Sequence, residues 1–381
     1  MSDQCLLIAG EKSGEEHALS FIGELKQLKP ELHFFGVGGD ELEKTGMELC
    51  YHLKDFSSFG FSEVVGKIPF YFRALKYLEN EVKRRQCKVA ILIDFQDFNL
   101  KLAKRLKKNG VKVLYYVAPQ AWAWKAGRAQ VLEETVHTLF SILPFEKKWF
   151  SDRGVKKIVS VPHPLSLRYK DELLKISEKP HELLKKKLKL LILPGSRNDE
   201  VRFLMPQFEQ TIINLRKLIK TPIEVGLVRS SNVKDELWQM YDSQIDRIWQ
   251  NEDLSKALSW AHLSLAASGT VTLATGLFQV PSVVAYQGSL LNQYIFETFV
   301  RYDKPISLTN LILGTRVFPE FIQERASAFN MTSALLELMT NKHEYDRVKS
   351  ELSKLPKLLA GEDQPAHLML KAFDEKNEAF T

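Results

Sequence analysis

Two carboxylates in the first half of the chain are the clearest candidates for a catalytic base. Asp94 and Asp97 directly follow the apolar run 89–93, which is typical of a buried strand. A carboxylate at the carboxyl end of a parallel strand is placed to take a proton from a hydroxyl nucleophile. The spacing leaves a second interpretation open, in which Asp97 only caps a helix that begins near residue 98.

A turn at the corresponding place in the second half is suited to hold a phosphate. Gly195, Ser196 and Arg197 follow the expected strand 189–193, which is apolar from residue 190 on. The guanidinium of arginine presents paired N–H donors in a fixed fork that matches a phosphate. The turn is therefore a candidate phosphate clamp.

A second loop of the same half has similar properties. Ser268, Gly269 and Thr270 lie between an apolar run and a helical pattern. Ser268 is a natural N-cap, and the backbone amides after it would point at a bound anion. Each loop alone fits a simple helix cap, but the two together favour a nucleotide diphosphate site. A base in one half and phosphate-binding loops in the other indicate group transfer from an activated phosphate donor.

The segment 10–16 at the end of the first apolar run is a weaker candidate. Its glycines allow close approach of the backbone to a ligand, and Ser13 is expected to cap the following helix. The segment is not GxGxxG and lacks the Lys-Ser/Thr ending of a P-loop. A plain capped helix start explains it equally well.

Short apolar runs alternate with helical patterns along the whole chain, which is typical of parallel strands joined by crossover helices. The pattern restarts near residue 189, so we expect an α/β fold of two Rossmann-like domains, with parallel sheets facing a central cleft. The expected domains are residues 1–167 and 188–355, joined by a charged connector, 168–187, with a helix in 356–381 packing back onto the first. The expected strands are 5–9, 33–37, 89–94, 111–117, 138–143, 157–161, 189–193, 223–228, 262–266 and 282–285.

The composition is that of an ordinary soluble protein, with 26% charged residues and a net charge of +6. This mild excess suits anionic ligands or an anionic membrane surface and does not indicate nucleic acid. The three cysteines have no metal or redox spacing and indicate reduced thiols in a cytosolic protein. No signal peptide is recognisable, and no apolar stretch reaches the ~18 residues that span a bilayer. Any membrane contact is therefore expected to be peripheral.

Aromatic residues gather in the segments 56–61 and 68–73, beside basic residues, and again in 290–302. Such segments suit an interfacial patch or a groove for acyl chains, although core packing explains part of them equally well. The candidates for acyl or membrane contact are Phe59, Phe61, Ile68, Phe70, Phe72 and Arg73.

Taken in order, these motifs resemble the lipid-A-disaccharide synthase family, which consists of inverting glycosyltransferases of the GT-B type. The resemblance runs from about residue 7 to residue 323 and no single motif decides it. The segments that carry it are 10–14, 35–39, 59–64, 93–99, 116–124, 143–146, 163–165, 193–197, 200, 267–273, 308–311 and 319–323.

The resemblance implies a reaction in lipid A biosynthesis at the cytoplasmic face of the inner membrane of a Gram-negative bacterium. UDP-2,3-diacylglucosamine would donate its sugar to the 6-hydroxyl of 2,3-diacylglucosamine 1-phosphate, giving a β-1,6-linked disaccharide and UDP. It implies no metal and no other cofactor. Alternatives that stay open are another UDP-GlcNAc-using GT-B enzyme, whether transferase or epimerase, and a non-catalytic lipid or nucleotide-sugar binding relative.

The resemblance also implies roles for residues. Asp97 matches the general base, and Arg197 matches the residue that neutralises charge on the departing diphosphate. The positions expected near the substrates are Glu11, Ser13, Gly14, Asp94, Asn99, Gln120, Trp122, Glu146, His163, Gly195, Ser196, Glu200, Ser268, Gly269, Thr270, Asn310 and Gln323.

The chain departs from the family pattern at four positions. Glu15 stands where Asp is usual, Pro162 where Gly is usual, and Thr309 where Pro is usual. Ala274 replaces a common Glu, and in related transferases an acidic residue thereabouts holds the nucleotide ribose. The donor contacts of this chain are therefore expected to differ from the family pattern.

Overall fold

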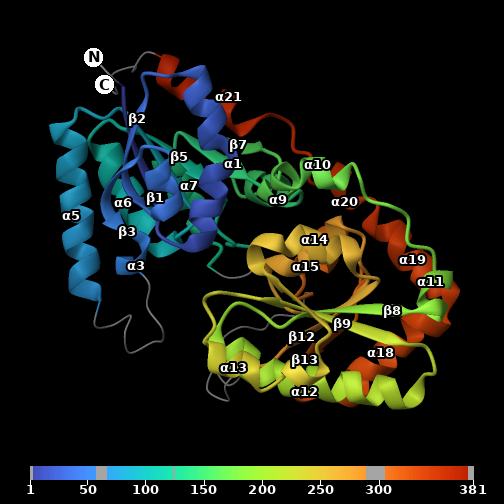
Figure 1. Ribbon diagram of the computed structural model, residues 1–381. Helices are drawn as coiled ribbons and strands as arrows, with labels where there is room; N and C mark the ends of the chain where they lie inside the picture. The colour runs from blue at the N-terminus through green and yellow to red at the C-terminus, as the bar shows by residue number, and fades with distance from the viewer. Residues whose placement is uncertain (1–2, 57–66, 123–124, 289–304, 376–381) are drawn as a thin grey trace. The chain divides into compact units, whose positions relative to one another are not determined.

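The structure, a computed structural model, describes residues 3–56, 67–122, 125–288 and 305–375. The chain divides into two compact units, residues 1–168 with 359–381 and residues 169–358. Each unit is an α/β structure built on its own parallel sheet (Figure 1).

The first unit contains a seven-stranded sheet in the order β3-β2-β1-β4-β5-β6-β7, in which every pair is parallel. This is the order of a doubly wound Rossmann sheet, in which ligands bind beyond the carboxyl ends of the strands. The strands are β1 (Gln4–Ala9), β2 (His33–Gly38), β3 (Glu48–His52), β4 (Val89–Ile93), β5 (Lys112–Tyr116), β6 (Thr138–Ser141) and β7 (Ile158–Ser160).

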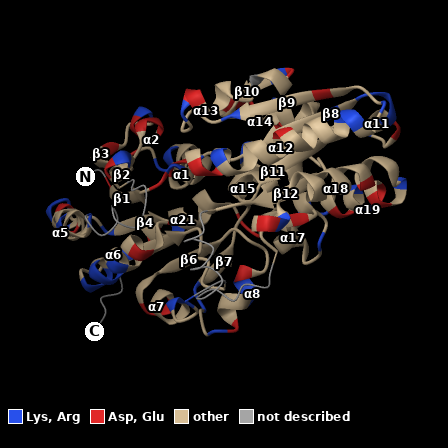
Figure 2. Ribbon diagram, turned by 90° about the horizontal axis from the view of Figure 1, so that it is seen from below, with Lys and Arg blue, Asp and Glu red and all other residues tan. Residues whose placement is uncertain are grey.

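Helices connect these strands, and the end of the chain returns to this unit. Helix α21 packs against α1, although the two are far apart in sequence (Figure 1). Lys and Arg predominate among the charged residues of α6 (Figure 2). The helices are α1 (Lys12–Leu28), α2 (Asp40–Lys44), α3 (Leu53–Phe56), α5 (Ile68–Arg84), α6 (Gln96–Lys108), α7 (Arg128–Thr135), α8 (Glu146–Ser151), α9 (Pro164–Arg168) and α21 (Pro365–Asp374).

The second unit contains a six-stranded parallel sheet in the order β10-β9-β8-β11-β12-β13. Helices α14 and α15 cover one face of this sheet, and α12 and α18 cover the other (Figure 1). The strands are β8 (Leu188–Leu193), β9 (Ile223–Arg229), β10 (Arg247–Gln250), β11 (Leu263–Ala267), β12 (Ser282–Tyr286) and β13 (Glu320–Ile322). The helices are α10 (Lys170–Leu173), α11 (Glu182–Lys186), α12 (Asn198–Leu218), α13 (Asp235–Gln239), α14 (Leu254–Trp260), α15 (Thr270–Leu277), α17 (Leu308–Leu313), α18 (Ala328–Thr340), α19 (Lys342–Leu352) and α20 (Leu355–Leu358).

The predicted fold class is confirmed, because both sheets are parallel and covered by helices. All ten expected strands are present, and β3, β10 and β13 were not expected. Each of these three lies at the edge of its sheet, and its side chains are partly or largely exposed. Edge strands therefore lack the continuous apolar run that marks a buried parallel strand. The segment 168–187, expected only as a connector, contains α10 and α11.

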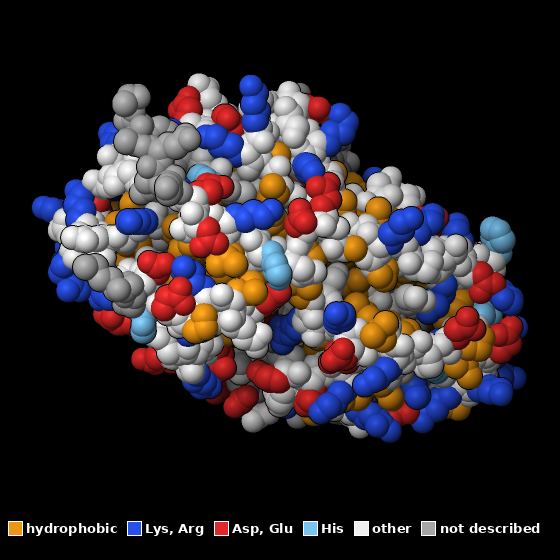
Figure 3. Space-filling view, turned by 90° about the horizontal axis from the view of Figure 1, so that it is seen from above, with side chains coloured by type: hydrophobic (Ala, Val, Ile, Leu, Met, Phe, Trp, Pro, Cys, Tyr) orange, Lys and Arg blue, Asp and Glu red, His pale blue; other side chains and the backbone are white. Residues whose placement is uncertain are grey.

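No helix among the described residues is both long and apolar enough to cross a membrane. On the face seen in Figure 3, acidic and basic side chains are interspersed, in keeping with the small net charge.

Candidate functional site

The turn that follows β4 places Asp94 on a strained backbone, and Asp97 lies just beyond it in α6. Asp94 and Phe95 each have a φ of 44°, in the left-handed region that non-glycine residues rarely occupy. Helix α6 begins at Gln96, with Phe95 in the N-cap position. The alternative interpretation of Asp97 as a helix cap is therefore wrong, because Asp97 lies inside the first turn of α6.

The carboxylate of Asp97 is exposed but held by a buried cation. Its side chain is 69% exposed, whereas that of Arg128, on α7, is 6% exposed. Nη2 of Arg128 donates to Oδ1 of Asp97 at 2.6 Å, and Nη1 donates to the side chain of Gln96. Nζ of Lys125 lies 3.8 Å from the same Oδ1. The carboxylate thus has a fixed direction while one side of it remains open to solvent.

The carboxyl group of Asp94 differs from that of Asp97 in its surroundings. Asp94 is half-buried, and burial together with the nearby carboxylate of Glu11 raises its pKa to about 6. A group that titrates near neutral pH is suited to general acid–base catalysis. The turn therefore offers two carboxylates, one exposed and ion-paired and one with a raised pKa.

Asn99, expected near a substrate, is completely buried behind this turn. Its Nδ2 donates to the carbonyl oxygens of Ile93 at 3.1 Å and Asp94 at 2.9 Å. The side chain therefore supports the backbone of the turn.

Trp122 and Glu146 are both buried and contact each other beyond the ends of β5 and β6. Nε1 of Trp122 donates to Oε1 of Glu146 at 3.1 Å, and the N–H of Leu143 donates to Oε2 at 3.3 Å. Burial raises the pKa of Glu146 to about 8, so this carboxyl is largely protonated at neutral pH. The pair fixes the segments around positions 122 and 146 to each other.

His163 and Gln120 differ in accessibility. His163 is buried, and its Nδ1 accepts a hydrogen bond from the N–H of Leu165 at 3.1 Å. Burial and the neighbouring His17 lower the pKa of His163 to about 3, so its ring is neutral at physiological pH. Gln120 is exposed.

The segment after β1 differs from expectation in its capping. Glu11 is the N-cap residue of α1, without a side-chain cap, and Ser13 lies inside the helix. The predicted cap at Ser13 is therefore wrong. Glu11 and Ser13 are exposed, and Gly14 is buried.

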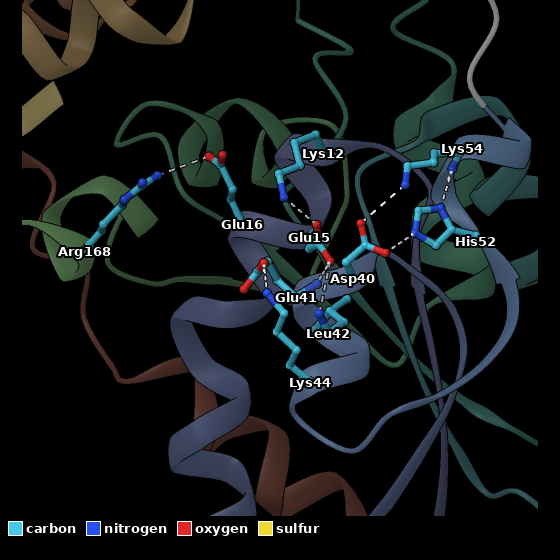
Figure 4. Close-up of polar contacts among 10 residues, drawn as sticks. All are labelled: Lys12, Glu15, Glu16, Asp40, Glu41, Leu42, Lys44, His52, Lys54 and Arg168. Atoms are coloured by element: carbon cyan, nitrogen blue, oxygen red, sulfur yellow. Dashed lines mark hydrogen bonds and ion pairs between the residues drawn. The ribbon is translucent and has the colours of Figure 1, made fainter. Parts of the chain in front are cut away.

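Glu15 links the segments after β1 and β2 (Figure 4). Its Oε1 accepts hydrogen bonds from the N–H groups of Glu41 at 3.1 Å and Leu42 at 3.0 Å, and its Oε2 pairs with Lys12 at 2.7 Å. A Cβ atom at Gly39 would lie 2.6 Å from Oε1 of Glu15, so the close approach requires glycine there. The buried carboxylate satisfies amides at the start of α2.

In the second unit, the carboxylate of Glu200 accepts hydrogen bonds from the N–H groups of the candidate phosphate turn. Its Oε2 accepts from the N–H groups of Ser196 at 2.8 Å and Arg197 at 3.2 Å, and its Oε1 lies 2.7 Å from Nη1 of Arg197. Gly195 has a φ of 110°, and a Cβ there would lie 2.2 Å from Oε2 of Glu200. The carboxylate therefore braces the turn from inside, while Ser196 and the Arg197 guanidinium are exposed to solvent.

The loop before α15 differs from the phosphate turn, because no described carboxylate accepts hydrogen bonds from its first backbone amides. The N-cap residue of α15 is Gly269, with a φ of 128°, so the predicted cap at Ser268 is wrong. The N–H of Ser268 donates to the carbonyl of Ala285 at 3.0 Å. Gly269 and Thr270 are exposed, and no described residue accepts a hydrogen bond from either amide. The start of this helix is thus open to an anion.

Asn310 is buried, and both ends of its amide are engaged. Nδ2 donates to the carbonyl of Phe318 and to Oε1 of Glu320, each at 2.8 Å. Oδ1 accepts from the N–H groups of Val317 and Phe318, each at 2.8 Å. Asn310 therefore holds α17 to the segment before β13.

Two further positions bear on the expected donor contacts. Oε1 of Gln323 accepts from the N–H of Gly288 at 3.2 Å, and Gln323 itself has a φ of 52°. Ala274 is buried within α15.

Comparison with known proteins decides the family. The profile of the lipid-A-disaccharide synthetase family matches residues 5–370. The chain belongs to this family. The lipid-A-disaccharide synthase of Myxococcus xanthus is 34% identical over 327 residues, covering 84% of this chain and 83% of the relative. That of Anaeromyxobacter dehalogenans is 32% identical over 344 residues, covering 89% and 88%.

Solved structures support the fold alone, because their sequence identity to this chain is low. UDP-GlcNAc 2-epimerase from Neisseria meningitidis, bound to UDP-GlcNAc, superposes with a TM-score of 0.57 at 10% identity, covering 97% of this chain and 99% of the epimerase. A calicheamicin glycosyltransferase superposes with a TM-score of 0.60 at 13% identity, covering 98% of each chain. The predicted membership of the lipid-A-disaccharide synthase family, with its GT-B fold, is confirmed.

The positions at which acyl contact was expected in this lipid-A-disaccharide synthetase family member divide into two groups. On α5, Ile68 is 46% exposed and Phe72 52% exposed, and Arg73 is exposed as well. Phe70 instead packs in an aromatic cluster, and the centre of its ring lies 5.2 Å from the centre of the Phe56 ring. Phe59, Phe61 and the segment 290–302 lie outside the described residues.

Sequence reasoning missed one residue of the candidate site and underestimated another. Arg128 belongs to no recognisable motif and lies 31 residues from its partner Asp97, so no local spacing indicates the pair. Glu15 was noticed only as a departure from the family pattern. The available signal was an acidic residue next to Gly14, together with Gly39 in the loop after the second strand, because glycine permits the close approach that Glu15 makes there.

Proposed function

We propose that the protein transfers 2,3-diacylglucosamine from its UDP donor to the 6-hydroxyl of 2,3-diacylglucosamine 1-phosphate, forming a β-1,6-linked disaccharide and UDP. The observation that carries the proposal is the family match across residues 5–370, with Asp97 and Arg197 present at the matching positions. Members of this family are glycosyltransferases, and the first unit and the second unit would each supply one part of the chemistry.

In the first unit, Asp97 would act as the general base. Its exposed Oδ atoms are accessible to an acceptor hydroxyl, and Arg128 fixes their direction. The carboxylate takes the proton of the 6-hydroxyl as that oxygen forms a bond to the anomeric carbon of the donor. The bond from the anomeric carbon to the diphosphate oxygen breaks, and its electron pair leaves with UDP. Asp94, whose pKa is raised to about 6, is the second candidate for the base.

In the second unit, the donor diphosphate would bind at the open start of α15 and at Arg197. Gly269 and Thr270 are exposed residues whose amides donate to no described residue, and the Arg197 side chain is exposed as well. Donors aimed at the oxygens where charge develops lower the barrier to departure of the leaving group. Glu200 would then support Arg197 and would not contact the donor.

The acyl chains of both substrates point to a membrane surface as the place of reaction. Ile68 and Phe72 are exposed apolar side chains on α5, and Nζ of Lys101 lies 5.7 Å from the centre of the Phe72 ring. Apolar side chains beside basic ones suit the interface of an anionic bilayer. We therefore assign the protein to the cytoplasmic face of the inner membrane, bound peripherally.

Incubation of the purified protein with both acylated sugars in detergent micelles, followed by mass analysis, tests the proposal. The expected product is the tetra-acylated disaccharide 1-phosphate together with UDP, and Asp97→Asn should form none while remaining folded. A parallel reaction with UDP-GlcNAc and non-acylated acceptors separates the alternatives. Turnover there without turnover of the acylated pair would overturn the proposal.

A further inference from the structure

Two consecutive residues of the acidic turn adopt a backbone conformation that requires support. Asp94 and Phe95 both have a φ of 44°. Residues other than glycine are strained in this region, and such strain persists only where the surrounding structure over-determines it. The contacts that hold these two residues are therefore informative about the turn.

Two buried side chains converge on one carbonyl oxygen, that of Asp94. Nδ2 of Asn99 donates to it at 2.9 Å, and Oη of Tyr115, on β5, donates to it at 2.7 Å. Both donor side chains are completely buried, whereas Asp94 itself is half-buried. The N–H of Asp94 donates in turn to the carbonyl of Tyr116 at 3.0 Å.

The ring of Phe95 braces the next residue of the turn. A Cβ atom on Gly10 would lie 2.6 Å from Cδ1 of Phe95, so the ring lies directly against the backbone after β1. The ring also contacts Phe56 and Phe98, with centroids 5.6 Å and 5.4 Å away. With its carbonyl held by two donors and its neighbouring ring packed, Asp94 has little freedom to turn.

We propose that Asn99 and Tyr115 are positioning residues of the reaction, which fix the carbonyl of Asp94 and so the directions in which Asp94 and Asp97 present their carboxylates to the acceptor. This inference rests on the proposed function. Asn99 then acts through the backbone and not as a substrate contact. Loss of either hydrogen bond should slow the chemical step and leave the binding of both sugars unchanged.

Tyr115→Phe is the sharpest test, because it removes the hydroxyl group alone. The matched control is Tyr116→Phe on the adjacent residue of β5, which is equally buried and whose side chain points to the opposite face of the sheet from that of Tyr115. The measurements are kcat and KM for both acylated sugars, the single-turnover rate, and the melting temperature of each variant.

We expect Tyr115→Phe to lower kcat and the single-turnover rate by roughly 10- to 100-fold, as misorientation of a reacting group does. Its KM values should stay within about twofold of the wild type, and Tyr116→Phe should retain wild-type kcat. Asn99→Ala should lower kcat at least as much as Tyr115→Phe, since it also frees the carbonyl of Ile93.

Equal kcat values for Tyr115→Phe and Tyr116→Phe would overturn the inference, whether both match the wild type or both fall with the melting temperature. A rise in KM without a fall in kcat would overturn it as well. Failure of the proposed function is a different result, because the wild-type protein itself would then form no disaccharide.

Discussion

Nη2 of Arg128 lies 2.6 Å from Oδ1 of Asp97, and the cation is 6% exposed while the anion is 69% exposed. The buried partner is anchored in the fold, so the accessible carboxylate gains a fixed direction without losing contact with solvent. Arginine suits this arrangement because its planar fork binds Asp97 and Gln96 with different nitrogens of one rigid group.

Replacement of Arg128 should therefore impair the reaction through Asp97. We expect Arg128→Ala to lower kcat by roughly 10- to 100-fold, because the carboxylate loses its orientation. Arg128→Lys should restore little, since an ammonium cannot contact both partners in the same geometry. Lys125→Ala should lower kcat less than Arg128→Ala does. Nζ of Lys125 lies 3.8 Å from Oδ1 of Asp97 and its side chain is half-exposed, and an ion pair of this kind interacts only weakly. Steady-state kinetics check all three, and an Arg128→Ala enzyme with wild-type kcat would contradict the role.

The buried strands were predictable because both faces of a parallel sheet are covered, which produces continuous apolar runs such as 89–93 and 190–193. Strands β3, β10 and β13 lie at sheet edges and carry mixed, partly exposed side chains. Their formation depends on pairing with a neighbour that is distant in sequence, which no local pattern records.

The candidate site was predictable only where a motif has fixed spacing. Asp97 and Arg197 each lie four residues beyond the last residue of a strand, and this position made them candidates. The pairing of Arg128 with Asp97 depends on tertiary placement, which sequence spacing does not give. The caps expected at Ser13 and Ser268 were wrong because α1 and α15 begin at Lys12 and Thr270, which puts Glu11 and Gly269 in the N-cap positions.

Glu200 should act on donor binding through Arg197. Glu200→Ala removes the carboxylate that holds the guanidinium and two amides of the turn, so we expect the KM for the UDP donor to rise by roughly 5- to 10-fold, about 1 kcal/mol. In an Arg197→Ala background the same change should have almost no further effect, because coupled residues are non-additive.

The matched control for this cycle is Asp199→Ala. Asp199 lies on the same turn of α12, and its side chain pairs with Arg202 and is 78% exposed. The hydrogen bonds from Ser196 and Arg197 go to Glu200 and not to Asp199. Its removal should leave the donor KM unchanged. Fully additive effects of Glu200→Ala and Arg197→Ala would show that Glu200 acts independently of Arg197.

Gly195 should tolerate no side chain while Glu200 is present. A Cβ there would lie 2.2 Å from Oε2 of Glu200, and the φ of 110° strains any other residue. We expect Gly195→Ala to lower the free energy of unfolding by roughly 1–3 kcal/mol and to weaken donor binding. In a Glu200→Ala background, Gly195→Ala should lower the free energy of unfolding by less, because the clash with Glu200 is gone and only the backbone strain remains. Gly23→Ala, which is helical and meets nothing within 4 Å, should not destabilise the protein.

Glu146 should make the stability of the protein fall as pH rises through neutrality. Its pKa is raised by burial from 4.5 to about 8, so between these values the folded state keeps a proton that the unfolded state has lost. The free energy of unfolding then decreases with rising pH across this window, by about 1.4 kcal/mol for each unit of pH in the limiting case, and the loss is complete above pH 8. Below pH 4.5 both states are protonated and the group has no effect.

Glu146→Gln should remove this slope, because an amide stays neutral and its oxygen can still accept from Nε1 of Trp122. The measurement is urea unfolding of the wild type and the variant at pH 5 and pH 8, with the exposed Glu43→Gln as the control that keeps the wild-type slope. The stability of Glu146→Gln relative to the wild type should be greater at pH 8 than at pH 5. An unchanged difference between the two proteins at the two pH values would mean that Glu146 is already ionised in the folded state, and that Trp122 and Leu143 stabilise a charged carboxylate.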